Sequence, residues 1–120
     1  MMTTDLHAPH AWVREFRGAV TVCDPDGIIL EMNEAAVASN AAEGGRKLIG
    51  TNVLDCHPEP SLTKLREFMA RRELNVYTVE KSGVKKLVYQ TPWHVDGRYA
   101  GFLEVVVEIP FAMPHFVRTG

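Results

Sequence analysis

The chain has 120 residues, of which 46% are hydrophobic and 23% are charged, and this composition is typical of one soluble globular domain with its own core. The formal net charge of −2 argues against nucleic acid as a partner, because phosphate binding draws on a clustered positive surface. No apolar run approaches the roughly 20 residues that cross a bilayer, so no membrane partner is expected.

The N-terminal residues predict a short amphipathic helix over 6–17. Trp12, Val13 and Phe16 follow i, i+1, i+4 spacing and form a narrow apolar stripe. Pro9 falls in the first turn, where its missing N–H costs little. We interpret residues 1–18 as a helical cap that docks on another surface.

A β-hairpin is predicted next. The β-prone segments 19–23 and 28–32 flank Asp24-Pro25-Asp26-Gly27, which has the composition of a tight turn. Asn33 then has the side chain of a helix N-cap, and Glu34 in the first turn complements the helix dipole. We therefore expect a helix directly after the hairpin, with a break at Gly44-Gly45.

The clearest helical pattern follows Pro58 and Pro60. Leu62, Leu65, Phe68 and Met69 recur at i, i+3, i+6 and i+7 and predict a helix with one buried stripe. Its basic residues lie largely on the other side, and we interpret them as a solvated helix face.

The last third of the chain predicts an antiparallel meander with strands over 74–81, 85–95 and 99–109. Ser82-Gly83 and Asp96-Gly97 are suited to two-residue hairpin turns, which require positive φ. In the last strand, one side carries Leu103 and Val105, whereas the other mixes Phe102 and Val106 with glutamates. We expect this half-apolar side to need a cover, either the stripe of Trp12, Val13 and Phe16 or a second subunit.

Taken together, these segments resemble the PAS domain family over residues 19–109. The resemblance is carried by the Asp24-Pro25-Asp26-Gly27 turn, the strand leading into Asn33-Glu34-Ala35-Ala36, Leu48-Ile49-Gly50 and the closing strand from Gly101. Cys56-His57-Pro58 is also similar to a PAS subgroup joined to hemerythrin-like domains.

The resemblance implies an α+β fold, a five-stranded antiparallel sheet in the order 2-1-5-4-3 with helices packed on one face. Pro110 and Pro114 are expected to end the sheet and to leave residues 110–120 as a tail. The resemblance also implies a sensory or interaction module, because many such domains hold a small molecule between sheet and helices and many dimerise through the outer sheet face and a leading helix.

We expect a small apolar or amphipathic ligand in a cavity between the sheet and the long helix. A ligand site is usually apolar with a few polar anchors. The candidate lining residues are His57, Leu65, Phe68, Met69, Tyr77, Tyr89, Thr91, Trp93, Leu103 and Val105. The candidate residues for a homodimer or cap interface are Trp12, Val13, Phe16, Phe102 and Val106. Plain core packing is the alternative for each of the lining residues.

Two cofactors of PAS domains, haem and flavin, bear on the roles of His57 and Cys56. His57, just ahead of the long helix, has the side chain of a haem axial ligand, and capping of the turn beside Pro58 is its alternative role. The light-sensing PAS subgroup binds flavin through a cysteine that follows a Gly-x-Asn sequence, but here Val53 follows Asn52. Cys56 comes three positions late, so no flavin adduct is expected, and we interpret Cys56 as a packing residue.

An enzymatic reading centres on Asp55 and His57. A buried pair of this kind serves small cone-shaped isomerases and dehydratases, but those folds usually place their helices before a long sheet, and this chain opens with a hairpin. We therefore expect a stand-alone, non-enzymatic sensory domain that signals by contact with a partner protein. Because no export signal or metal-type spacing accompanies Cys23 and Cys56, reduced thiols and a cytoplasmic location are predicted.

Overall fold

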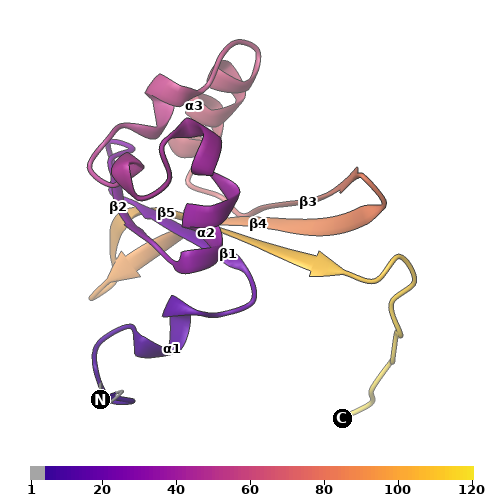
Figure 1. The fold of residues 1–120 in the computed structure, drawn as a ribbon. Helices are drawn as coiled ribbons and strands as arrows, with labels where there is room; N and C mark the ends of the chain where they lie inside the picture. The colour runs from indigo at the N-terminus through magenta and orange to yellow at the C-terminus, as the bar shows by residue number, and fades with distance from the viewer. Residues whose placement is uncertain (1–4) are drawn as a thin grey trace.

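The computed structural model describes residues 5–120, so residues 1–4 of the expected cap lie outside the described residues. A five-stranded antiparallel sheet in the order β2-β1-β5-β4-β3 forms its centre (Figure 1). The strands are β1 (Ala19–Cys23), β2 (Ile29–Met32), β3 (Asn75–Lys81), β4 (Val84–Val95) and β5 (Arg98–Ile109). The predicted α+β class and strand order are confirmed.

Two helices, α2 (Glu34–Ser39) and α3 (Ser61–Arg71), lie on one side of the sheet (Figure 1). Three short 3₁₀ helices connect them: η1 (Ala41–Glu43), η2 (Gly45–Leu48) and η3 (Val53–Cys56). The N-terminal helix, α1 (Ala11–Arg14), lies on the opposite side of the sheet. Within residues 5–120, none of the helices has the length and apolar character needed to span a membrane.

The two predicted hairpin turns have the backbone conformation that their sequences require. Asp96 and Gly97 have φ values of 50° and 79°, and Ser82 and Gly83 have values of 54° and 78°. Two successive residues with positive φ match the right-handed twist of the flanking strands. These turns fix β3, β4 and β5 as neighbours.

The N-terminal helix is shorter than the predicted span of 6–17. It forms a single turn at Ala11–Arg14, and His10 before it adopts the left-handed region at φ 63°. A helix this short gains little from its own hydrogen bonds, and a stripe of three apolar residues buries too little to extend it.

The core lies between the sheet and α2 and α3. Its buried side chains include Cys23, Ile29, Met32, Ala36 and Phe102. Phe102 is only 5% exposed, and its ring meets Phe68 of α3 edge-on with the centroids 5.5 Å apart. We call this side of the sheet the inner face, and it also carries Thr21, Val88, Gln90, Glu104 and Val106.

The other side of the sheet, here the outer face, faces α1. It carries Val20, Val22, Tyr89, Thr91, Leu103, Val105 and Val107. The sequence analysis assigned the two faces the wrong way round. The more apolar side of β5 was expected under the long helix, but the half-polar side with Phe102 and Val106 lies there. Phe102 is therefore buried in the core and is not available as an interface residue.

Candidate functional site

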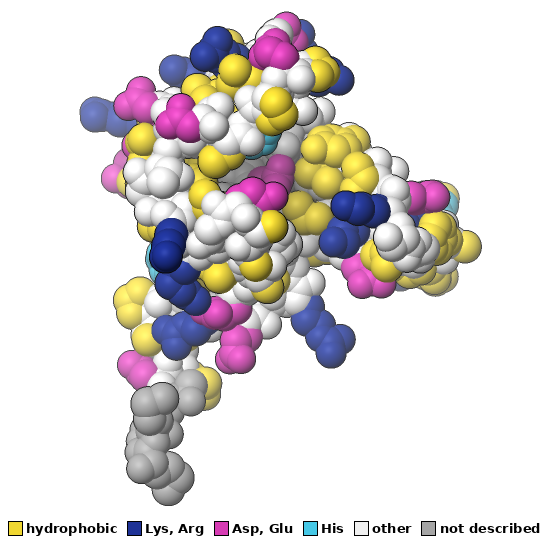
Figure 2. Space-filling view, turned by 45° about the horizontal axis from the view of Figure 1, so that its top comes forward, with side chains coloured by type: hydrophobic (Ala, Val, Ile, Leu, Met, Phe, Trp, Pro, Cys, Tyr) yellow, Lys and Arg dark blue, Asp and Glu magenta, His cyan; other side chains and the backbone are white. Residues whose placement is uncertain are grey.

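A cavity of about 260 Å³ lies between the inner face and the helices. Thr21, Cys23, Gln90, Phe102 and Glu104 reach it from the sheet. The other sides are formed by residues of β2, the 3₁₀ helices, α3 and the connecting loops: Ile29, Met32, Asn40, Glu43, Leu48, Val53, Cys56, His57 and Leu65. Figure 2 shows a hollow near the middle of this surface, with acidic side chains gathered at it.

A chain of side-chain hydrogen bonds crosses three strands of the inner face. The Asn75 amide Nδ2 donates to Gln90 Oε1 at 2.8 Å, and Gln90 Nε2 donates to Glu104 Oε2 at 2.7 Å. The three residues are cross-strand partners, Asn75 with Gln90 and Gln90 with Glu104. Pairing in register thus places an oriented carboxylate on the floor of the cavity.

The charge of Glu104 affects its neighbours on the same face. Burial, and secondarily the Glu104 carboxylate, raises the pKa of Tyr77 on β3. Burial is also the main cause that raises the pKa of the Cys23 thiol to about 12, with Asp24 and Glu104 adding to it. Cys23 therefore stays a neutral thiol at physiological pH and packs as an apolar group.

His57 follows η3 and borders the cavity. Its Nδ1 lies 2.7 Å from the carbonyl oxygen of Val53. Because a carbonyl only accepts hydrogen bonds, Nδ1 is the donor in this contact. The contact fixes the orientation of the ring beside the cavity.

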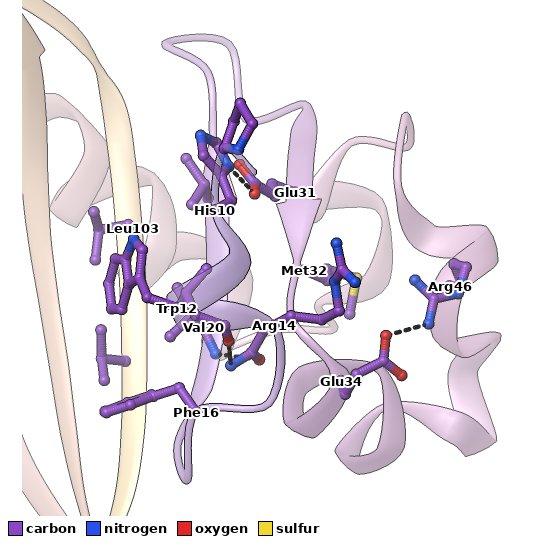
Figure 3. Close-up of a pocket in the computed structure, with 15 residues that line it drawn as sticks. His10, Trp12, Arg14, Phe16, Val20, Glu31, Met32, Glu34, Arg46 and Leu103 are labelled. Atoms are coloured by element: carbon purple, nitrogen blue, oxygen red, sulfur yellow. Dashed lines mark hydrogen bonds and ion pairs between the residues drawn. The ribbon is translucent and has the colours of Figure 1, made fainter. Parts of the chain in front are cut away.

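A second, larger groove of about 630 Å³ lies on the outer face, beneath the N-terminal segment. Trp12 and Phe16 point toward the strand that carries Leu103 (Figure 3). The segment is held at two points, where Asn33 Nδ2 donates to the Val13 carbonyl at 3.0 Å and where His10 Nδ1 contacts the Glu31 carboxylate. Trp12 remains 78% exposed, so the segment covers the outer face only in part.

Nine of the ten candidate lining residues fall into three groups. His57 and Leu65 border the cavity, while Phe68 and Met69 of α3 pack against the core beside it. Tyr77 lies on the inner face, close enough to Glu104 for the carboxylate to contribute to its raised pKa. Tyr89, Thr91, Leu103 and Val105 share one face, as the alternation predicts, but this is the outer face.

The remaining candidates also have defined places. The Trp93 indole N–H donates to the Cys23 carbonyl at 3.0 Å, so this side chain ties β4 to the end of β1. Trp12, Val13 and Phe16 line the outer groove. Val106 lies on the inner face in a separate hollow beside α2.

Sequence reasoning missed the polar residues that the sheet contributes to the cavity. Thr21, Gln90 and Glu104 lie on neighbouring strands, and no motif joins them. The available signal was that Asn75, Gln90 and Glu104 are polar positions on strands that were expected to be adjacent. Only the pairing register aligns them.

The cavity does not fit a haem. Its volume lies below the roughly 300–1,000 Å³ of sites for drug-sized ligands, and a haem macrocycle needs at least that range. Nor do the residues 5–120 bring together three His, Cys, Asp or Glu side chains in a way that would hold a metal ion. Asp55 is exposed and does not line the cavity, and the His57 ring nitrogen Nδ1 is engaged by Val53. The Asp55–His57 pair of the enzymatic reading is therefore not formed.

Comparison with known proteins gives matches at the level of structure. No protein-family model matches the chain, and no curated protein sequence matches it. A C-terminal domain from Streptococcus mutans superposes with a TM-score of 0.71 at 18% identity, over 88% of this chain and 85% of that one.

Two PAS domains also match over most of their length. The PAS domain of BvgS from Bordetella pertussis has a TM-score of 0.62 at 16% identity, covering 84% of this chain and 83% of that one. The Aer2 receptor from Vibrio cholerae, a dual PAS-haem oxygen sensor, has a TM-score of 0.58 at 14% identity, covering 78% and 95%. Strand order, helix placement and these superpositions agree, and the chain has the fold of a PAS domain.

Proposed function

We propose that this chain is a sensory PAS domain that binds a small molecule in the cavity between the inner face and the helices. The observation that carries the proposal is the cavity itself, a hollow of about 260 Å³ between the sheet and the helices, with room for more than a water molecule. Its position between sheet and helices also means that an occupant contacts both layers. Mixed apolar and polar lining is the usual composition of a ligand site.

Occupancy would act on the rest of the molecule through the helices. The cavity is bordered by η3, by His57 and by Leu65 of α3, so a ligand would favour one packing of these elements over another. A ligand shifts such an equilibrium only by its difference in affinity for the two arrangements. The signal would then pass by contact to a partner protein.

The same proposal includes a homodimer formed through the outer face. This face is rich in Val and Leu, and the N-terminal segment leaves much of it uncovered. Large exposed apolar patches mark interaction sites. An interaction module without a ligand is the second candidate function, and the exposed outer face is the observation that favours it.

A cytosolic setting fits the cysteines. Cys23 and Cys56 are both free thiols, one buried and one exposed. Free thiols persist in a reducing compartment.

Native mass spectrometry of the protein purified without added cofactor tests the ligand. The expected result is a bound mass in the native spectrum that is lost on denaturation. The absorption spectrum of the same sample distinguishes haem, because a Soret band would contradict our assignment of a small ligand.

A pair of matched variants locates the binding site. Thr21→Leu adds volume on the inner face within the cavity, whereas Thr91→Leu makes the same change on the outer face. We expect Thr21→Leu to abolish the bound mass and Thr91→Leu to retain it, with circular dichroism confirming that both fold. Equal retention by the two variants would place the ligand elsewhere, and an apo protein that binds nothing in a broad screen would favour the interaction module.

A further inference from the structure

The side chains that border the cavity carry charge of one sign. Glu104 on the sheet and Glu43 in η1 are both carboxylates, and none of the lining residues is Lys or Arg. His57 is the remaining basic side chain, and its Nδ1 is committed to the Val53 carbonyl. An anionic ligand would meet two like charges here, whereas a cation would meet two opposite ones.

Among residues 5–120, no cationic side chain forms an ion pair with Glu104. The two ion pairs found within residues 5–120 join His10 to Glu31 and Arg46 to Glu34. Lys86 lies on the same face and lines the neighbouring hollow, which Glu104 also borders, but the ion pairs of the described residues do not include these two, and the cross-strand partner of Lys86 is Glu108. A positive group bound in the cavity would be attracted to this half-buried carboxylate.

The hydrogen-bond chain orients this carboxylate. An ionised carboxylate only accepts, so Gln90 must turn its NH₂ toward Glu104, and its oxygen must then face the NH₂ of Asn75. This arrangement gives Glu104 Oε2 one donor and leaves acceptor capacity on the carboxylate for a ligand. Charge-assisted hydrogen bonds of this kind are roughly twice as strong as neutral ones.

The remainder of the lining sets the shape of the occupant. Ile29, Met32, Leu48, Val53, Leu65 and Phe102 present apolar surface. A volume of about 260 Å³ excludes ligands of full drug size. A compact apolar body with one polar head fits this division.

We infer that the ligand is a small organic cation, an ammonium or amidinium group on a compact apolar body, with its charged head against Glu104. This assignment rests on the proposed function, since it names the ligand class of the same cavity. It narrows the small apolar or amphipathic ligand that the sequence predicts to one that carries a positive charge.

Three probes of one size and different charge test the inference: benzylamine, benzyl alcohol and benzoate. Binding to the wild-type protein is followed by two-dimensional amide NMR titration, which also maps the site. We expect benzylamine to shift resonances around the cavity and to bind at least tenfold more tightly than benzyl alcohol. Benzoate should bind most weakly. Equal binding of the amine and the alcohol, preference for benzoate, or no binding of benzylamine would overturn the inference.

Two variants of β5 assign the preference to one carboxylate. Glu104→Gln should remove the tenfold advantage of benzylamine and leave benzyl alcohol unchanged. Glu108→Gln neutralises the next carboxylate on the same side of the strand, outside the cavity, and should leave both affinities as in the wild type. The wild-type comparison stands even if Glu104→Gln does not fold. A bound mass in native spectrometry without any preference for cations would refute the ligand class and retain the sensory proposal.

Discussion

Gly101 occupies a position on β5 where any larger residue collides with the neighbouring strand. A Cβ atom there would lie 2.0 Å from the Cys23 carbonyl oxygen, and the residue has a φ of 130°. The same carbonyl accepts the hydrogen bond from the Trp93 indole. Gly101 therefore allows the ends of β1, β4 and β5 to meet at one point, next to the register shift between Trp93 and His94.

We predict that Gly101→Ala lowers the free energy of unfolding by about 3 kcal/mol, from overpacking and from an unfavourable φ together. Gly97→Ala is the matched control. Gly97 also has positive φ, but nothing lies within 4 Å of a Cβ there, so only about 1 kcal/mol is expected. Urea unfolding measures the free energy of unfolding of both variants. Equal losses of this free energy would show that the contact between Gly101 and β1 is unimportant.

At the scale of elements, Asn33 joins three segments of the chain. Its Oδ1 accepts from the Ala36 N–H at 3.1 Å, which caps α2, and from the Val20 N–H of β1 at 2.9 Å. Its Nδ2 donates to the carbonyls of Val13 and Gly18. One buried side chain thus positions α2, the start of β1 and the N-terminal segment relative to each other.

We predict that Asn33→Ala costs about 3 kcal/mol of stability, because it removes a cap and leaves buried backbone groups unpaired. Asn52→Ala is a suitable control, since Asn52 also caps a short helix through Leu54 and makes one further bond to the Asp26 carbonyl. The Asn52→Ala variant should lose only about 1 kcal/mol of stability. Thermal unfolding ranks the two, and an Asn33→Ala variant as stable as Asn52→Ala would contradict this role.

At the scale of the whole molecule, the two faces of the sheet differ in composition. The inner face combines the core with the polar chain and the cavity, while the outer face presents apolar side chains beneath a thin N-terminal segment. A second copy of the chain would extend that partial cover. The proposed dimer and the proposed ligand site thus lie on opposite sides of one sheet.

We predict that Tyr89→Glu raises the dimer dissociation constant at least tenfold, because it buries a charge in an apolar interface. Val79→Glu is the control, since Val79 is similarly exposed, 42% against 40%, but lies on the inner side of β3. Sedimentation equilibrium measures both constants. A wild-type monomer at high concentration, or a Tyr89→Glu variant that dimerises normally, would exclude this interface.

Most of the fold could be predicted from short-range interactions in the sequence. The Asp96-Gly97 turn, the Asn33 cap and the apolar stripe around Leu65 each depend on interactions within a few residues, and the structure contains all three. The grouping of Tyr89 and Thr91 with Leu103 was also correct.

The assignment of faces required information beyond local patterns. Apolar content alone favours burying the side with Leu103 and Val105, but Phe102 and Phe68 together fix the opposite side in the core. The Asp96-Gly97 turn would align Gln90 with Leu103, and the bulge at Trp93/His94 shifts this pairing to Glu104. The pairing of Gln90 with Glu104 in the cavity thus depends on a register irregularity that the residue pattern does not predict.

The amide chain from Asn75 to Glu104 links the charge in the cavity to the edge of the sheet. While Glu104 is ionised, both amides have a fixed polarity, and Asn75 uses its NH₂ inward on Gln90. If Glu104 takes up a proton, its new O–H donates and both amides are free to reverse, so that Asn75 turns its oxygen inward instead. The exchange of donor for acceptor at Asn75 then occurs at the start of β3, which is an exposed edge strand of the sheet. The orientation of a single edge amide thereby reports the protonation state of a carboxylate two strands away.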